Sequence, residues 1–432
     1  MHFLTRLGFD RKTLVRFLII VANSQIIYSF NAIREVLYNP YVEALGVSHA
    51  QFGILMGLIG AMSTFGNVPL GWIQDRFSAR KVLAIDTLIV GSVGMFIALT
   101  PNTSFAVLLP CFVLIGLFTE PLYWATVLKS VRATAKDDKQ ATAFGFMEFG
   151  RGLAAFLQNG AGILIYTVLG STFFGIKAAM VFNASITLLS ALLVWFAVPD
   201  EDLIQAKKGT EKTKIAFSGL LKALKMPEIW MTGIAASCVY ATFTAVSTYF
   251  VPYLQSVYLL PAALVGVFGL VNTSVIRFIS GPISGVCADQ KFKSSAHWMR
   301  LCYIVLAVML TAALLLPKSA KLVIPAMLML MVISVFCYLV RGVYFAPIGE
   351  ANVPAEMGAA AMSVASFIGY SPSLWGYTVF GAIIDRFAPA TAYSIIFTLL
   401  IGLSIIGIVM TTLLGRRIVR RRAQQETLSE AA

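Results

Sequence analysis

Charged side chains lie inside long apolar stretches of this 432-residue chain. Glu148 and Arg151 stand three residues apart, so a helix places them on one face. Arg277 and Arg341 lie in two further apolar stretches, and no acidic residue is close to Arg277 in the sequence. Arginine binds carboxylate and phosphate oxygens through a planar fork of N–H groups. These residues predict a site for a small organic anion; a self-satisfied structural ion pair is the alternative for Glu148 and Arg151.

Other polar residues extend this predicted site. On a helix Glu120 shares a face with Tyr123 and Trp124, and Arg341 shares one with Tyr344. Near the end of the first apolar stretch Arg34 and Glu35 follow Asn31 and precede Tyr38, although Arg34 can also snorkel to lipid headgroups. We predict ligand contacts from Asn31, Arg34, Tyr38, Glu120, Tyr123, Trp124, Arg151, Arg277, Arg341 and Tyr344. A glutamate is the expected proton carrier, because no histidine lies mid-stretch, and the candidates are Glu35, Glu120 and Glu148.

Composition indicates what must position these residues. Hydrophobic residues make up 58% of the chain and charged residues 12%, against roughly 25% charged in a soluble domain. This excludes a soluble globular enzyme, a disordered chain and a nucleic-acid-binding domain. The net charge of +13 comes without a basic stripe of interleaved aromatics, so no nucleic-acid partner is expected. A lipid bilayer is the expected surrounding.

Twelve stretches are long and apolar enough to cross a bilayer, which takes about 20 residues. Their shared feature is a near-continuous apolar run between short polar loops. They lie at 14–38, 51–72, 81–100, 104–129, 139–166, 172–198, 228–256, 262–286, 298–316, 322–347, 357–384 and 390–415. The predicted fold class is therefore an all-α membrane protein with twelve transmembrane helices.

Basic residues set the expected orientation, since Lys and Arg concentrate in cytoplasmic loops. One side carries Arg76, Arg80, Lys81, Arg132, Lys136, Lys139, Lys291, Lys293, Arg416, Arg417, Arg420, Arg421 and Arg422. The opposite loops 39–50, 101–103 and 257–261 carry none, and Lys318, Lys321 and Arg386 are the exceptions. Both termini are predicted to be cytoplasmic. The basic N-terminus lacks a suitable cleavage site, so we expect a retained first helix and not a signal peptide.

Cysteine and histidine positions argue against metal or cofactor chemistry. The five cysteines lie in apolar stretches without CxxC or Cys/His ligand spacing, and the three histidines are scattered. No nucleophile elbow, HExxH motif, phosphate-binding loop or paired metal carboxylates occur. We therefore expect no metal, no cofactor, no catalytic residues and no enzymatic activity.

The chain divides into two halves that resemble each other weakly. The polar stretch 199–227 separates predicted six-helix bundles at 1–198 and 228–416, and a basic cytoplasmic tail follows at 417–432. TEPLYWATVLK in the first half matches VRGVYFAPIGE in the second, which pairs Glu120 with Arg341 and Lys129 with Glu350. If a pseudo-two-fold axis relates the halves, these opposite charges face each other across a central cavity. Chance similarity is the alternative.

Residues 71–81 carry a family resemblance. They read GWIQDRFSARK and resemble the loop between helices two and three of the major facilitator superfamily, with Ser78 departing from the usual glycine. The second half keeps only Gly285 and Asp289 of this motif. The resemblance implies two six-helix bundles and a cytoplasmic gate in which Asp75 meets a helix N-terminus. The gating residues expected from the motif and the repeat are Asp75, Arg76, Arg80, Lys129, Asp289 and Glu350.

The resemblance implies a secondary transporter that works by alternating access. The segment YSFNAIREVLYNPYVEALG is similar to organophosphate–phosphate antiporters, but 228–256 lacks the second arginine of that branch, so the subfamily stays open. We expect a small organic, anionic or phosphorylated substrate and proton symport. Anion exchange without protons and a non-transporting membrane sensor are the alternatives. The expected location is a bacterial inner membrane, and the expected state is a monomer.

Overall fold

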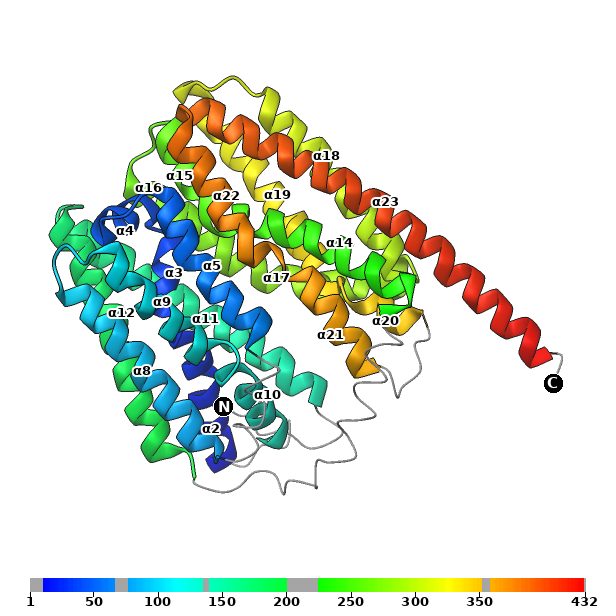
Figure 1. Cartoon of the computed structure of the whole chain (residues 1–432), viewed down its shortest axis with the longest axis horizontal. Coiled ribbons are helices and arrows are strands. Elements are labelled where there is room, and N and C mark those ends of the chain that lie inside the picture. Colours follow the sequence, from blue (N-terminus) through cyan, green and yellow to red (C-terminus); the bar gives the residue numbers. More distant parts are fainter. Residues whose placement is uncertain (1–10, 67–76, 135–139, 200–223, 352–357, 431–432) are drawn as a thin grey trace. The chain divides into compact units, whose positions relative to one another are not determined.

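The computed structural model describes residues 11–66, 77–134, 140–199, 224–351 and 358–430. Every regular element within these ranges is a helix, and none of the described residues forms a strand (Figure 1). The apolar sequence explains this, because a helix satisfies its backbone hydrogen bonds within one segment and so tolerates lipid. The all-α membrane fold predicted from the apolar stretches is confirmed.

The chain forms two compact units. The first unit comprises Met1–Ala206 and Leu260–Phe278, and the second comprises Lys207–Leu259 and Ile279–Ala432. Leu260–Phe278 joins the first unit because its helices pack against the long helix at 140–168. Most of the predicted linker at 199–227 lies outside the described residues, so the division into bundles there stays a prediction.

The helices of the first unit follow the predicted apolar stretches. They are α2 (Arg11–Ile26), α3 (Ser29–Ala32), η1 (Ile33–Glu35), α4 (Tyr38–Leu45), α5 (His49–Phe65), α8 (Ala79–Leu99), α9 (Phe105–Thr119), α10 (Tyr123–Thr134), α11 (Gln140–Val168), α12 (Phe173–Ala197), α16 (Ala262–Leu270), η4 (Val271–Val275) and the first residues of α17 (Ile276–Val286). Two helix starts have clear caps. Ser48 and Gln51 form a reciprocal capping box at α5, and Thr172 accepts from the Gly175 N–H at 3.2 Å before α12.

The second unit begins with a long interrupted helix and ends with the longest helix of the protein's described part. Its elements are α14 (Pro227–Thr244), η3 (Ala245–Tyr249), α15 (Phe250–Val257), the rest of α17, η5 (Cys287–Lys291), α18 (Ser295–Leu315), η6 (Ala320–Leu322), α19 (Val323–Val343), α20 (Ala346–Glu350), α21 (Gly358–Gly369), α22 (Pro372–Arg386) and α23 (Pro389–Glu430). Figure 1 shows α23 as one unbroken helix, coloured orange to red.

Seven helices of the described residues are long and apolar enough to cross a membrane, or up to nine if two bent pairs each count as one span. Each of the twelve predicted stretches nevertheless contains at least one described helix. The difference arises partly from interruptions. Stretch 104–129 is divided into α9 and α10, and stretch 357–384 into α21 and α22, so each piece is shorter than a full span.

Large apolar side chains cover the outside of the helices. On α12, Leu189 is 62% exposed and Phe196 is 82% exposed, whereas Asn183 and Thr187 on the same helix are 1% exposed. A helix in lipid shows this pattern, because lipid accepts apolar side chains and polar side chains pair between helices. The exposed stripe of α12 is therefore its lipid-facing side.

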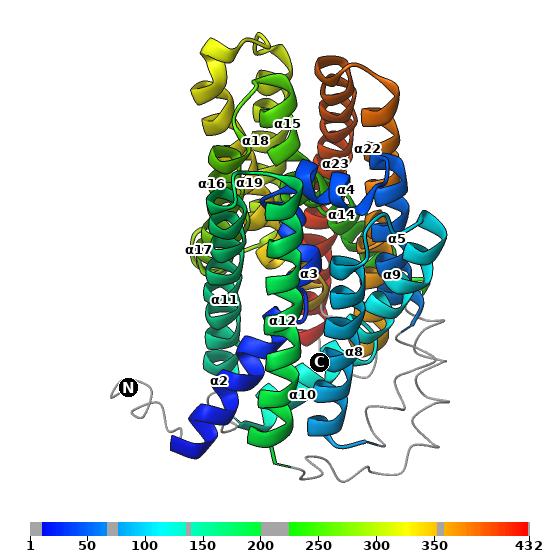
Figure 2. The ribbon, with the colours of Figure 1, turned by 90° about the vertical axis from the view of Figure 1, so that its left-hand side faces the viewer.

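Small residues let neighbouring helices approach closely. In the first unit α8 and α12 run side by side (Figure 1 and Figure 2), and a Cβ added at Gly91 would lie 3.0 Å from Leu188. In the second unit a Cβ added at Gly407 of α23 would lie 2.6 Å from the Tyr303 ring of α18. These glycines fix the helix contacts that hold the site-bearing helices in place.

Interruptions in the helices place polar residues in mid-span. The break between α9 and α10 and the break between α19 and α20 both fall in the segments that match in the sequence repeat. η3 and η4 are π-helical turns within two other spans. Such turns often mark functional positions, since they free backbone groups and redirect side chains.

Candidate functional site

The first group of predicted residues gathers around Arg151 on α11. Its Nη1 atom lies 3.0 Å from Oε1 of Glu148, one turn earlier on the same helix. Its guanidinium carbon lies 4.5 Å from the centre of the Trp124 ring on α10. The Arg151 Nε atom is buried without a hydrogen-bond partner among the described residues. The guanidinium therefore has an acidic partner, an aromatic face and one buried donor without a described partner.

Glu120 lies at the break between α9 and α10. The Ser63 side chain of α5 hydrogen-bonds the Glu120 carboxylate, and Arg151 is near enough to interact with it electrostatically. The backbone N–H of Trp124 donates to the Glu120 carbonyl at 3.3 Å. This hydrogen bond connects the two sides of the break between α9 and α10. The structure thus brings Glu120, Trp124 and Glu148 together around Arg151.

Tyr123 belongs to a different, fully buried cluster. Its hydroxyl donates to Oδ1 of Asn23 on α2, and Nδ2 of Asn23 donates to Thr87 at 3.1 Å and to Ser190 at 2.9 Å. Tyr123 itself has no exposed surface. Of the cluster, sequence reasoning named Tyr123 alone, because a single amide or hydroxyl in an apolar stretch gives no signal by itself.

Asp86 is a second residue that sequence reasoning missed. It lies next to Thr87 on α8 and is only 4% exposed. A signal was present, since Asp86 is a carboxylate inside the apolar stretch 81–100. Charged residues within membrane helices are costly and usually have a function.

The second unit holds its own cationic group. The guanidinium carbon of Arg341 on α19 lies 3.6 Å from the centre of the Phe243 ring and 5.5 Å from that of Tyr240, both on α14. The Arg341 Nε atom is buried without a hydrogen-bond partner, and no described carboxylate forms an ion pair with Arg341. Tyr344 and Tyr370 share a hydrogen bond of 3.0 Å between their hydroxyl oxygens.

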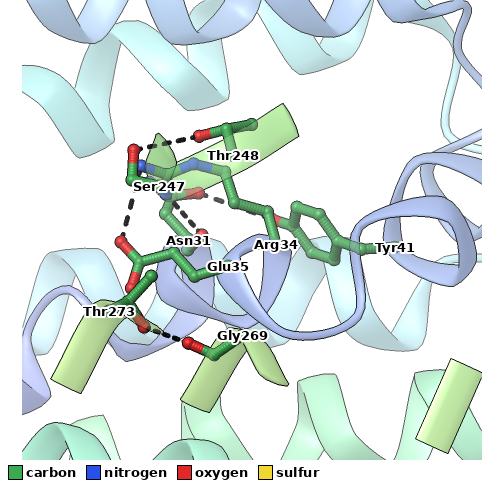
Figure 3. Close-up of polar contacts among 8 residues, drawn as sticks. All are labelled: Asn31, Arg34, Glu35, Tyr41, Ser247, Thr248, Gly269 and Thr273. Atoms are coloured by element: carbon green, nitrogen blue, oxygen red, sulfur yellow. Dashed lines mark hydrogen bonds and ion pairs between the residues drawn. The ribbon is translucent and has the colours of Figure 1, made fainter. Parts of the chain in front are cut away.

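Figure 3 shows the residues around Arg34. Its Nη1 atom donates to the backbone carbonyl of Asn31 at 2.6 Å, and its Nη2 atom lies 3.9 Å from Oε1 of Glu35. The Tyr41 hydroxyl donates to the Asn31 side chain at 3.4 Å. Asn31, Arg34 and Glu35 therefore form one cluster at the end of the first span.

Tyr38 packs against α5. Its hydroxyl lies 3.1 Å from Nδ1 of His49, and the two rings stack with their centres 5.5 Å apart. Tyr38 has no exposed surface. Sequence reasoning gave no indication of the His49 contact, because the partner follows a turn between two helices.

Arg277 lies at the start of α17, in the part that belongs to the first unit. The Phe278 ring next to Arg277 contacts the Phe149 ring next to Glu148, with ring centres 5.0 Å apart. Further along α11 the side chains of Gln158 and Asn159 are buried, and their amide groups have no hydrogen-bond partner among the described residues. Buried amides are normally hydrogen-bonded. The amides of Gln158 and Asn159 are therefore available in α11 as further hydrogen-bonding groups beyond Arg151.

The predicted gating residues are only partly described. Asp75, Arg76 and the side chain of Lys129 lie outside the described residues. The Arg80 guanidinium lies over the Trp195 ring at 4.9 Å, and Asp289 is exposed on η5. Glu350 ends α20 and accepts from the Ser295 N–H at 2.6 Å and from the Ser294 hydroxyl at 3.3 Å. Its carboxylate thus lies at the N-terminus of α18, where the helix dipole favours an anion.

No group of three or more His, Cys, Asp or Glu side chains that could hold a metal ion occurs in the described ranges. Cys111, Cys238, Cys302 and Cys337 are buried as free thiols. Buried free cysteines act as small apolar side chains.

Comparisons with known proteins agree with this architecture. The family model of the Major Facilitator Superfamily matches residues 14–377. The inner membrane protein YihN of Escherichia coli K12 is 27% identical over 401 residues, which cover 92% of this chain and 94% of YihN. The inner membrane protein YqcE of the same strain is 24% identical over 395 residues, covering 89% of this chain and 91% of YqcE.

A solved structure shows the same fold. It is that of a bacterial homolog of the human lysosomal transporter Spinster in an inward-facing, unoccupied conformation. The TM-score is 0.76 at 15% sequence identity, with 95% of this chain and 98% of the other covered. At this identity the likeness concerns the arrangement of helices.

Proposed function

The chain belongs to the Major Facilitator Superfamily, and from that premise we propose that it carries a small organic anion across the membrane together with protons. As a member of this family it is a multi-pass membrane transporter and not an enzyme. Alternating access, in which two helix bundles rock around a site near the bilayer midplane, is the proposed mechanism. The proposed substrate is anionic or phosphorylated.

The observation that carries the anion proposal is the environment of Arg341. Aromatic rings surround its guanidinium, and no described carboxylate neutralises it. A charge inside a membrane protein requires a partner, since leaving it unpaired costs about 2.5–3.5 kcal/mol even on the permissive insertion scale. An anionic substrate is the partner we propose.

Arg151 is the second proposed anion contact. Glu148 occupies one edge of its guanidinium, Trp124 covers a face, and its Nε atom lacks a partner among the described residues. Further proposed substrate contacts in the first unit are Asn31, Arg34, Tyr38, Tyr123 and Arg277. In the second unit Tyr344 is proposed beside Arg341. The buried amides of Gln158 and Asn159 add hydrogen-bonding groups that suit a polar solute.

Proton coupling is proposed to involve the carboxylates beside these arginines. Glu148 pairs with Arg151, and Glu120 lies within the electrostatic reach of the same arginine. A substrate anion competes for Arg151, and a carboxylate that loses its cation gains proton affinity. Substrate binding and proton uptake are then linked through one guanidinium. Glu35 beside Arg34 is the corresponding candidate at the end of the first span.

The gate is proposed to use charges at helix ends. Glu350 at the N-terminus of α18 supplies the anion–dipole contact that the resemblance assigns to Asp75. Arg76, Arg80, Lys129 and Asp289 are the remaining proposed gate residues. We propose a monomer in the cell inner membrane with both termini in the cytoplasm, in line with its basic loops and with the names of its inner-membrane relatives YihN and YqcE.

Thermal unfolding in liposomes tests the substrate class. Purified protein is heated with panels of carboxylates, phosphate esters, neutral sugars and amines, because a ligand that binds only the folded state raises the melting temperature. Anions that stabilise the wild type are then used for uptake with and without a proton gradient. Stabilisation by neutral or cationic compounds alone would overturn the anion proposal, and uptake that persists without the gradient would indicate exchange.

A further inference from the structure

Asp86 is a buried carboxylate that the proposed transport site does not use. It lies near the beginning of α8, a helix that packs against α9, α10 and α12. The residue is 4% exposed, and its Oδ2 atom has no hydrogen-bond partner among the described residues. No ion pair joins it to a described basic residue. Among the described residues the carboxylate therefore has no cationic partner, and its Oδ2 atom has no hydrogen-bond donor.

None of the charged groups with described side chains on the surrounding helices forms an ion pair with Asp86. On α8 itself Arg80 stacks on Trp195, and Lys81 is exposed. Lys177 of α12 donates to the backbone carbonyls of Ile97 and Thr100, at the other end of α8. The remaining titratable groups with described side chains on α9 and α10 are Cys111 and Tyr123, which carry no positive charge.

Tyr123 links Asp86 to the transport site. It interacts electrostatically with both Asp86 and Arg151. Its hydroxyl donates to Asn23, which in turn donates to Thr87 beside Asp86. A change of charge at Asp86 therefore alters the electrostatic environment of Tyr123, which also interacts with Arg151, the proposed anion-binding arginine.

An ionised carboxylate that is buried without a cation or a hydrogen bond is strongly disfavoured, and binding a proton removes the penalty. We propose that Asp86 is a proton-binding site of this transporter and holds its proton in the conformation described here. The balance is simple: the Asp86 carboxylic acid releases one proton to water and becomes a carboxylate, and the reverse step reloads it. Its role in coupling rests on the proposed function, whereas its proton occupancy does not.

Infrared spectroscopy tests the occupancy without any substrate. Wild-type protein in liposomes at neutral pH is compared with Asp86→Asn, which keeps the side-chain shape, and with Glu43→Gln, an exposed carboxylate on α4. The carbonyl band of a protonated carboxylic acid is expected in the wild type and in Glu43→Gln and absent in Asp86→Asn. An unchanged band in a folded Asp86→Asn protein would overturn the proposal.

Tyr123→Phe supplies a second variant in case Asp86→Asn does not fold. It removes the hydroxyl but keeps the ring, so the pH at which the infrared band disappears is expected to shift. An identical pH profile would show that Asp86 is not linked to Tyr123 and would overturn that part of the proposal.

Transport assays then test the coupling role. Asp86→Asn is expected to keep substrate exchange close to wild type and to lose proton-driven accumulation at least ten-fold. Full accumulation in this variant would overturn the coupling role. If the wild type transports no anion, the proposed function fails, but the infrared band still decides whether Asp86 holds a proton.

Discussion

The guanidinium carbon of Arg341 lies 3.6 Å from the centre of the Phe243 ring. An aromatic face attracts the guanidinium cation but does not accept hydrogen bonds from its N–H groups. A carboxylate partner does accept them. Arg151, by comparison, already donates to Glu148 at 3.0 Å. The two arginines therefore differ in how much of their hydrogen-bonding capacity remains for a substrate.

Replacement of Arg341 by Gln is expected to weaken anion binding by roughly ten- to a hundred-fold, because a hydrogen bond to a charged group contributes about 1.5–3 kcal/mol. The measurement is the anion concentration that gives half of the maximal thermal stabilisation. Arg386→Gln is the matched control, since Arg386 also lies over a ring, that of Phe387 at 5.9 Å, but is exposed at the end of α22. Equal affinities in the wild type and Arg341→Gln would contradict the proposed anion contact.

Glu148→Gln is expected to separate binding from proton coupling. Its side chain is 52% exposed, so the loss of the ion pair should lower the free energy of unfolding by less than about 1 kcal/mol. Substrate exchange should persist while accumulation driven by a proton gradient is lost. Vesicles with an imposed pH gradient provide the measurement, and Glu43→Gln provides the control. If both Glu148→Gln and Glu120→Gln kept normal gradient-driven uptake, coupling through these glutamates would be wrong.

Glu350→Ala removes the acceptor at the N-terminus of α18. Loss of a helix cap typically lowers the free energy of unfolding by about 0.5–2 kcal/mol. Glu350→Gln should cost less, because an amide oxygen still accepts from the Ser295 N–H although the charge is gone. Thermal unfolding of the two variants and the wild type measures which substitution lowers the stability more. Equal stability in Glu350→Ala and the wild type would show that this contact contributes nothing.

Two glycines on α23 provide a paired test of helix packing. A Cβ at Gly407 would lie 2.6 Å from the Tyr303 ring, whereas a Cβ at Gly402 meets nothing within 4 Å. Gly407→Ala is expected to destabilise the protein by about 1–3 kcal/mol, as overpacking usually does. Gly402→Ala should be neutral or slightly stabilising, because Ala favours a helix more than Gly does. Similar melting temperatures for the two variants would mean that α18 moves away from α23 easily.

The family and the helical fold could be predicted from the sequence, because both depend on patterns that extend over the whole chain. Apolar stretches of about 20 residues and the loop motif at 71–81 were sufficient. The breaks inside spans were not predicted. Stretch 104–129 reads as continuous, although the chain leaves the helix at 120–122, where Pro121 cannot donate a backbone hydrogen bond.

Individual site contacts were harder to predict than the helices. The pairing of Glu148 with Arg151 follows from helical spacing and is present in the structure. The contacts of Arg341 with Phe243 and of Tyr38 with His49 join different helices, and no local spacing encodes them. Asp86 was missed although it is a carboxylate inside the apolar stretch 81–100, because only the packing of α8 shows that it is buried.

The hydrogen bonds of Asn23 to Thr87 and Ser190 have a consequence for how the helices are aligned. In lipid the hydrophobic effect does not fix how far one apolar helix has slid along another, because lipid tails are as apolar as the neighbouring side chains. A shift of α2 by one turn, about 5.4 Å, would separate Asn23 from both partners at once. The Asn23 amide therefore fixes the position of α2 along its axis relative to α8 and α12, which are the third and sixth predicted spans.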